Sequence, residues 1–173
     1  TAQGTKVRPE QFVPDYPGLL DVELASRGSY VHGETVMQLD VSKLLGTLRD
    51  YPLDATLKAG LDKGALKLEA LNAQVGENHL QAKGQSTDEL LIEWAVDAPQ
   101  LAQLHPEVTG RLQGNGQLSG KVDGSAFNLA VEQMEGQVFG YPLKARGGLS
   151  LANDLLTAND VQVDVGDNHL QLN

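Results

Sequence analysis

The stretch L-D-V-S-K-L-L-G-T-L-R-D-Y-P-L-D-A at residues 39–55 aligns with L-A-V-E-Q-M-E-G-Q-V-F-G-Y-P-L-K-A at residues 129–145. In the same register, G-E-N-H-L-Q at 76–81 aligns with G-D-N-H-L-Q at 166–171, so residues 39–83 recur without a gap at 129–173. Such a duplication indicates a fold that grows by adding units, as a solenoid or a long sheet does. A residue constellation that is present in both copies is more often scaffold than active site.

The second copy stops at Asn173, where the first continues through Lys83 and Gly84. We therefore expect the chain to be an excised piece of a longer protein. Its 173 residues, 40% of them hydrophobic, suffice for one domain or for two fused half-domains.

The formal net charge of −10 argues against nucleic acid as a partner and against docking on an anionic bilayer. The absence of cysteine excludes disulfides and thiolate metal sites. The sequence shows neither a signal peptide nor an apolar run of membrane-spanning length.

Period-two alternation dominates the chain and predicts strands with one apolar and one polar face. The clearest run spans residues 111–123, where Leu112, Leu118 and Val122 share a face with three glycines. Glycines on an apolar face allow sharp bending, so we expect a curved strand there. The fold class predicted is all-β, an elongated curved sheet of repeated strands with little helix.

Interruptions of the alternation predict where strands bend or end. Apolar residues change phase between Ala70 and Leu71, and again between Ala158 and Val161, which indicates a bulge or a tight corner in both copies. Turn signals occur at 27–29, 32–33, 62–64, 76–78, 123–124 and 166–168. One short helix is expected at Pro99–Leu104, opened by Asp97 and stopped by Pro106, and Val41–Leu48 is a weaker helical candidate.

A one-faced sheet without covering helices must pack its apolar side on another sheet, close into a barrel, or curl around a groove. An interior of mostly Leu, Val, Ala and Gly favours a smooth apolar trough. Sandwich packing is an equal alternative on the pattern alone.

No catalytic or metal-binding constellation emerges from the sequence, so we expect neither an enzyme nor a cofactor or metal site. The four histidines are dispersed, and no serine lies in a nucleophile elbow. Gly114–Gly120 lies within an alternating strand and opens no helix, so it cannot cradle phosphate as a nucleotide-binding loop does. Acidic residues are spread over polar faces. Trp94 falls on the apolar side, where a core or groove anchor is expected.

The stretch W-A-V-D-A-P-Q-L-A-Q-L-H-P-E-V-T-G-R-L-Q-G-N-G-Q-L-S-G-K-V-D-G at residues 94–124 resembles the TamB family, the translocation and assembly module subunits related to AsmA-like proteins. That family repeats a strand, a D-A-P turn with a short helix, and a G-R-L-x-G-x-G-x-L-S-G strand. Together with Y-P-L at Tyr51 and Tyr141, the resemblance covers most of the chain from about Leu19.

The resemblance implies a U-shaped apolar trough, a β-taco, in a periplasm-spanning protein anchored in the inner membrane of a Gram-negative bacterium. It implies a TamA-like outer-membrane barrel of the Omp85 type as partner, bound through a part of the parent that is absent here. It also implies roles in outer-membrane biogenesis, autotransporter secretion and phospholipid transport. Neither the anchor nor a C-terminal end is recognisable, so we expect a middle section, with residues 1–18 as an N-terminal extension and 19–173 as the trough.

Two functional classes remain open, with a closed spacer as a third option. In the first, the trough conducts phospholipid acyl chains. In the second, it is a chaperone-like scaffold for amphipathic strands of unfolded outer-membrane proteins. The residues expected to line the groove are Leu20, Val22, Leu24, Leu57, Leu66, Trp94, Leu112, Leu118, Val122, Leu129 and Leu149.

Overall fold

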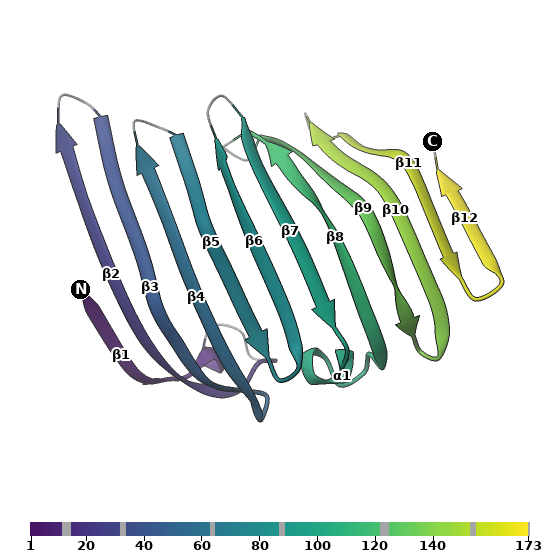
Figure 1. Cartoon of the computed structure of the whole chain (residues 1–173), viewed down its shortest axis with the longest axis horizontal. Coiled ribbons are helices and arrows are strands. Elements are labelled where there is room, and N and C mark those ends of the chain that lie inside the picture. The colour runs from purple at the N-terminus through teal and green to yellow at the C-terminus, as the bar shows by residue number, and fades with distance from the viewer. Residues whose placement is uncertain are drawn as a thin grey trace.

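The computed structural model describes residues 1–11, 15–31, 34–62, 65–86, 89–121, 125–152 and 155–172, apart from the side chains of Val31 and Glu34. Within these ranges the chain forms one antiparallel sheet of twelve strands, whose spatial order is their order in the sequence (Figure 1). The all-β prediction is confirmed. Because every strand pairs with its neighbour along the chain, the sheet is a meander that runs from β1 to β12.

The strands of the first half are β1 (Ala2–Val7), β2 (Gly18–Val31), β3 (Glu34–Leu48), β4 (Tyr51–Asp62), β5 (Ala65–Val75) and β6 (Asn78–Ser86). Those of the second half are β7 (Leu90–Ala98), β8 (Gly110–Gly120), β9 (Ala126–Val138), β10 (Tyr141–Ala152), β11 (Leu155–Val165) and β12 (Asn168–Leu172). A 3-10 turn, η1 (Pro9–Gln11), precedes β2, and the helix α1 (Leu101–Leu104) joins β7 to β8.

The structure refines the local predictions. The short helix is confirmed as α1, but Asp97 does not open it, because Asp97 lies in β7 and the N-cap residue is Gln100. The helical reading of Val41–Leu48 is wrong, since this segment is the end of β3 and pairs with β4. The turn signal at 27–29 is also wrong: these residues continue β2, where Gly28 pairs with Met37.

Other predictions fall wholly or partly outside the described residues, namely those for Val122 and for the turns at 32–33, 62–64 and 123–124. At the N-terminus, Ala2–Val7 joins the sheet as edge strand β1, in antiparallel pairing with β2. The proposed boundary at residue 18 remains a prediction.

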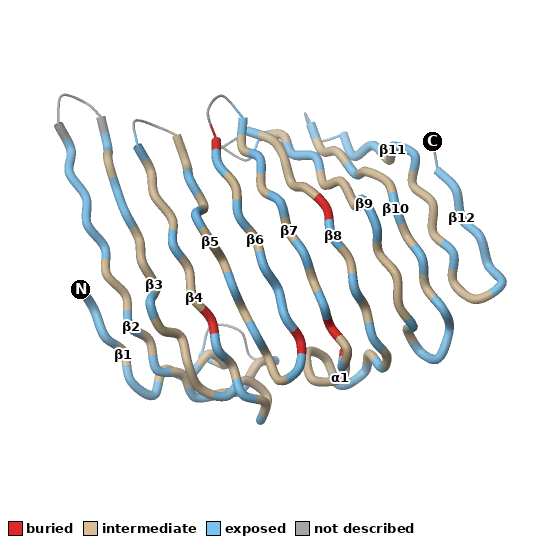
Figure 2. Tube along the Cα trace, in the orientation of Figure 1, coloured by how far each residue is buried: buried red, intermediate tan, exposed pale blue. Residues whose placement is uncertain are grey.

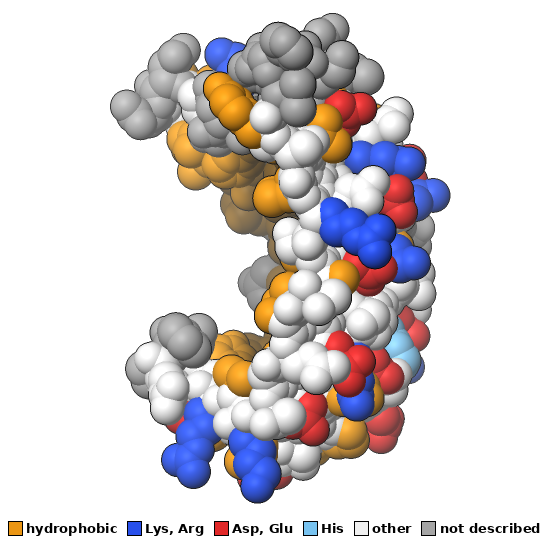
Figure 3. Space-filling view, turned by 90° about the vertical axis from the view of Figure 1, so that its left-hand side faces the viewer, with side chains coloured by type: hydrophobic (Ala, Val, Ile, Leu, Met, Phe, Trp, Pro, Cys, Tyr) orange, Lys and Arg blue, Asp and Glu red, His pale blue; other side chains and the backbone are white. Residues whose placement is uncertain are grey.

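The sheet is strongly curved. Seen from the β1 side, it has a C-shaped outline with hydrophobic side chains in the hollow and most charged side chains on the outer surface (Figure 3). Since the bend runs along each strand, the hollow extends across the strands, from one end of the sheet to the other. At the roughly 4.8 Å spacing of neighbouring strands, twelve strands extend it over about 50 Å.

A closed core is absent from the described part of the chain. The buried hydrophobic residues there are Ala55, Ala98 and Leu101, and no large side chain is fully buried (Figure 2). The accessible surface is 11429 Å², whereas a compact monomer of this mass exposes roughly 8,200 Å². Both observations exclude the sandwich, whose two sheets would bury their facing side chains.

A bulge in β5 explains the phase change of its apolar residues. Lys58 pairs with Ala70 and the next residue, Ala59, with Leu68, so Glu69 is an extra residue without an opposite partner in β4. The extra residue lets both apolar segments of β5 point to the same side of the sheet. A bulge in β11 does the same near Asp160, which has a positive φ of 49°.

The two sequence copies adopt similar strand pairing, although the register between β4 and β5 breaks between Lys58 and Ala59, whereas that between β10 and β11 breaks between Arg146 and Gly148, the equivalents of Thr56 and Lys58. Leu53 pairs with Val75 as Leu143 pairs with Val165, and the register between β3 and β4 breaks at the positions equivalent to the break between β9 and β10. The turns that follow are also alike, since Gly76 and Gly166 have φ values of 60° and 58°. The strands β3–β6 and β9–β12 therefore share much of their pairing pattern, and the superposition of the two copies remains a prediction.

Candidate functional site

The concave face is built from rows of directly paired residues, which point to the same side of a sheet. The central row crosses nine strands and contains Leu24, Val41, Leu57, Leu71, Ala82, Trp94, Gly116, Val131 and Gly147. A parallel row contains Val22, Leu44, Ala55, Ala73, Leu80, Val96, Gly114, Met134, Ala145, Val163 and Leu170. No charged residue interrupts either row, so the hollow is an apolar groove.

The structure places the predicted lining residues as follows. Leu118, Leu129 and Leu149 are successive partners in one further row, and Leu24, Leu57 and Trp94 share the central row. The remaining described residues of the set, Leu20, Val22, Leu66 and Leu112, lie on the same face of the sheet. Contact of these side chains with a ligand remains a prediction.

Other residues of this face were missing from the predicted set. Val41, Leu44, Ile92 and Met134 belong to the same rows and are only half-buried. The period-two signal that identified Leu57 could have found them as well. It failed for Val41 and Leu44 because the register break between these two residues was mistaken for a helical pattern.

Trp94 is the largest side chain on the groove floor. It pairs with Gly116 of β8, and a Cβ atom at position 116 would stand 2.7 Å from Cζ2 of the indole. The indole therefore lies over Gly116 and occupies the space that a side chain at this position would fill. Its Nε1 atom is buried and has no hydrogen-bond partner in the described structure.

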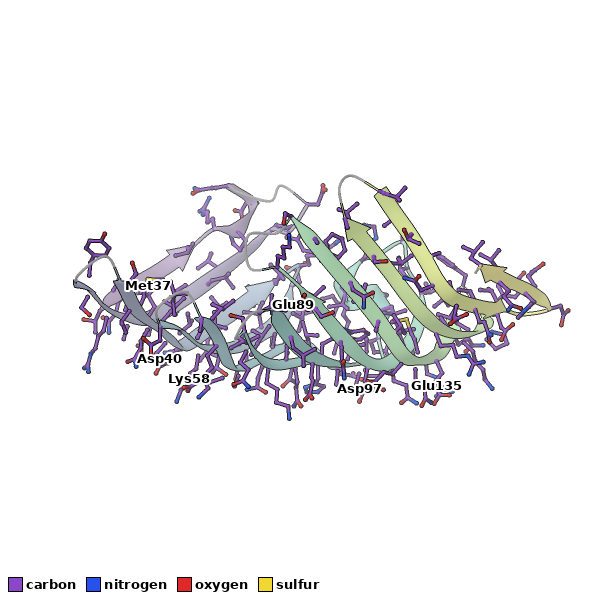
Figure 4. The ribbon with its side chains drawn as sticks, turned by 90° about the horizontal axis from the view of Figure 1, so that it is seen from above. Met37, Asp40, Lys58, Glu89, Asp97 and Glu135 are labelled. Carbon is purple, nitrogen blue, oxygen red and sulfur yellow. The ribbon has the colours of Figure 1, made fainter. Side chains whose placement is uncertain are left out.

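The convex face is polar. Figure 4 shows the side chains of Asp40, Lys58, Asp97 and Glu135 on this outer side of the sheet. Cross-strand polar contacts join several neighbours, including Gln113 Nε2 donating to Glu135 Oε1 at 2.6 Å, Lys83 Nζ to Glu93 Oε2 at 3.2 Å, and His169 Nδ1 with Asp164 Oδ1 at 2.5 Å. The convex face is thus charged and hydrated, which favours the solubility of an open sheet.

The described residues contain no group of three or more His, Cys, Asp or Glu side chains placed to hold a metal ion. In the same part of the chain, the helices are too short and too polar to cross a bilayer.

Helix α1 lies at the lower rim of the groove, near the start of β6 (Figure 1). Gln103 Oε1 accepts hydrogen bonds from the backbone N–H of Glu77 at 2.8 Å and from Asn78 Nδ2 at 3.2 Å. Arg49 Nη1 donates to the carbonyl oxygen of Leu104 at 3.4 Å, and its guanidinium lies over the ring of Tyr16. These contacts fix the helical turn to the rim.

Comparison with known proteins assigns the family. Residues 1–133 match the family description "TamB, N-terminal domain". The chain belongs to the TamB family. The sequence resemblance to this family is confirmed, and the expectation of a middle section remains a prediction.

One TamB relative is the "Translocation and assembly module subunit TamB" of Haemophilus influenzae. It is 28% identical over 133 residues, which cover 76% of this chain and 10% of the relative. The chain thus spans about a tenth of that TamB protein. No solved structure matches the chain.

Proposed function

We propose that this TamB segment is a section of an envelope-spanning groove that conducts phospholipid acyl chains between the inner and outer membranes. The observation that carries the proposal is the open concave face, whose apolar rows cross the sheet without a covering layer. Support comes from family membership and from the name of the Haemophilus relative, a subunit of a translocation and assembly module.

The groove suits acyl chains because its surface is continuous, apolar and poor in hydrogen-bonding groups. The rows run across the strands, so a chain lying along one row meets a new apolar position about every 4.8 Å. Each methylene group that leaves water for such a surface contributes about 0.8 kcal/mol when fully buried. The contacts are non-directional, so a chain can slide from one position to the next.

In the intact protein we place this segment in the periplasm, in a parent anchored in the inner membrane. The parent partners with a TamA-like barrel of the Omp85 type and supports outer-membrane protein assembly. The segment itself acts by binding and transfer, without catalysing a reaction.

A second candidate function is a scaffold for amphipathic strands of outer-membrane proteins or autotransporters during secretion. The observation in its favour is the same open apolar face, against which the apolar side of an extended amphipathic strand could pack.

Site-specific photo-crosslinking in cells distinguishes these functions. A photoreactive amino acid replaces Leu57 or Leu118 on the concave face. In the matched controls it replaces a chain neighbour that points to the convex face, namely Lys58 beside Leu57 or Gln117 beside Leu118. We expect phospholipid adducts, read by mass spectrometry, at positions 57 and 118 and much less at 58 and 117. Protein adducts from outer-membrane barrels in place of lipid would support the scaffold. Equal lipid labelling on both faces would contradict the conduit.

A further inference from the structure

Both sulfur atoms of the chain lie on the concave face of the sheet. The 173 residues include two methionines, Met37 and Met134, and no cysteine. Met37 pairs directly with Leu61 of β4, and Met134 lies in an apolar row of the groove floor, so both side chains point into the groove. Figure 4 shows Met37 on the opposite side of the sheet from Asp40 and Lys58. The sulfur chemistry available to this chain is therefore confined to the groove.

Met37 is the more accessible of the two methionines. It is 45% exposed and lies near the upper end of β3, whereas Met134 is half-buried on the groove floor. The partner of Met37 in β2 is Gly28, so no side chain covers the thioether from that position. The oxidation of a sulfur-containing side chain by a dissolved oxidant becomes faster as its exposure increases. An aqueous oxidant should therefore reach Met37 before Met134.

The second half of the sheet has a side chain without sulfur at the corresponding place. Phe127 pairs with Leu151, the equivalent of Leu61, and with a glycine on its other side, as Met37 does. It is 39% exposed. A phenylalanine side chain thus fits the same surroundings, and Met37→Phe is the matched replacement that the chain itself offers.

Oxidation by a peroxide turns the apolar thioether into a polar group. A lone pair of the sulfur attacks one oxygen of hydrogen peroxide, the O–O bond breaks, and an S–O bond forms. The sulfur is oxidised by two electrons, and the peroxide is reduced by the same two. The departing hydroxide takes the proton of the transferred oxygen and leaves as water. The product, methionine sulfoxide, is polar, and enzymes reduce it back to methionine.

We propose that Met37 is an oxidation site through which a peroxide lowers the affinity of the groove for apolar chains. The sulfoxide oxygen accepts hydrogen bonds from water, and an acyl chain that passes over it offers no donor in exchange. Binding at this position then leaves a polar group without a partner, which is unfavourable. Because the sulfoxide can be reduced, the loss is reversible. The loss of affinity rests on the proposed function, whereas the selectivity of the oxidation for Met37 does not.

Mass spectrometry of the full 173-residue chain tests the selectivity. In dilute hydrogen peroxide, Met37 should gain oxygen at least about threefold faster than Met134, because its sulfur is more exposed. After unfolding in guanidinium chloride the two rates should become equal, which would show that the difference comes from the fold. Equal rates in the folded chain, or faster oxidation of Met134, would overturn the proposal.

Photo-crosslinking to a dansyl-labelled fatty acid tests the loss of affinity. A photoreactive amino acid replaces Leu61, the partner of Met37, and the control chain carries it in place of Leu151, the partner of Phe127. After oxidation and removal of the peroxide, labelling at position 61 should fall about tenfold, the equivalent of about 1.4 kcal/mol, and labelling at position 151 should not change. Unchanged labelling at position 61, with Met37 fully oxidised, would overturn the proposal and leave the proposed function standing. Absence of labelling at both positions before oxidation would contradict both.

Replacements of the methionines assign the effect to one sulfur. In the Met37→Phe chain, labelling at position 61 should be the same before and after peroxide. In the Met37→Gln chain, a permanently polar amide stands in for the sulfoxide, so labelling at position 61 should be low without any oxidant. Met134→Leu, which introduces the residue of the equivalent Leu44, should keep the peroxide sensitivity of the parent chain. A comparable fall in the Met37→Phe chain would show that another side chain, such as Trp94, is responsible, and would overturn the assignment.

Discussion

Trp94 and Gly116 face each other across β7 and β8, and the indole occupies the space that a side chain at position 116 would need. A Cβ atom there would also stand 2.0 Å from the carbonyl oxygen of Ala130 in β9. The glycine therefore meets neighbours on both sides. It lets the largest side chain of the groove lie flat on the floor, which keeps the groove open.

Gly116→Ala should destabilise the chain by about 1–3 kcal/mol, because the added methyl group displaces Trp94 and the backbone of β9. Chemical denaturation followed by Trp94 fluorescence measures the loss. Gly60→Ala is the control, since the nearest atom to a Cβ there is Met37 O, at an ordinary 3.6 Å. Equal stability of the two variants would show that Trp94 does not depend on the glycine.

Leu118→Asp should leave the chain folded and abolish lipid co-purification. In the open groove the carboxylate stays hydrated, so the loss is that of a half-buried leucine, about 1–2 kcal/mol, or a few degrees in Tm. Leu20→Asp should behave alike. Calorimetry and lipid extraction from the purified protein test both points, with Gln117→Asp on the convex face as control. Complete unfolding by Leu118→Asp would show that this side chain belongs to a closed core.

Asn78→Ala should cost about 1–3 kcal/mol, because it removes a buried amide that accepts from the N–H of Gln100 and donates to Val75 O and Gln103 Oε1. The equivalent change, Asn168→Ala, should stay within about 0.5 kcal/mol, since Asn168 is exposed and its side-chain amide bonds to Val165 O within its own turn. Thermal denaturation of the two variants gives the comparison within one chain. Similar losses would contradict the different burial of the two copies.

Deletion of Glu69 should be tolerated, at a cost below about 1 kcal/mol. Without this residue, Leu68 and Leu71 remain on the concave face, and the register with β4 becomes regular. The lost ion pair with Lys67 is exposed and contributes little.

Deletion of Asn72, also an outward-facing residue of β5, provides the contrast. It turns Ala73 and Val75 to the opposite side and should destabilise the chain by roughly 3 kcal/mol or more. Circular dichroism melting distinguishes the two deletions. If both unfold the chain, then the bulge is itself required for the curvature of the sheet.

The amino-acid sequence by itself determined the class of the fold and the two faces of the sheet. A strand has a side-chain period of two, so alternation in the sequence predicts which residues share a face without knowledge of their neighbours. For the same reason the phase changes at Ala70 and Ala158 located both bulges, and Pro106 with the preceding leucines located α1.

Only the tertiary structure decided that the sheet stays open, because a one-faced strand is compatible with a sandwich as well as with a groove. It also showed that Ala2–Val7 is a strand and that residues 27–29 continue one, since pairing with β2 and β3 overrides weak local signals. The hydrogen bond between Asn78 and Gln103 has no sequence signature. It joins groups far apart along the chain, which come together only when β7 has paired with β6.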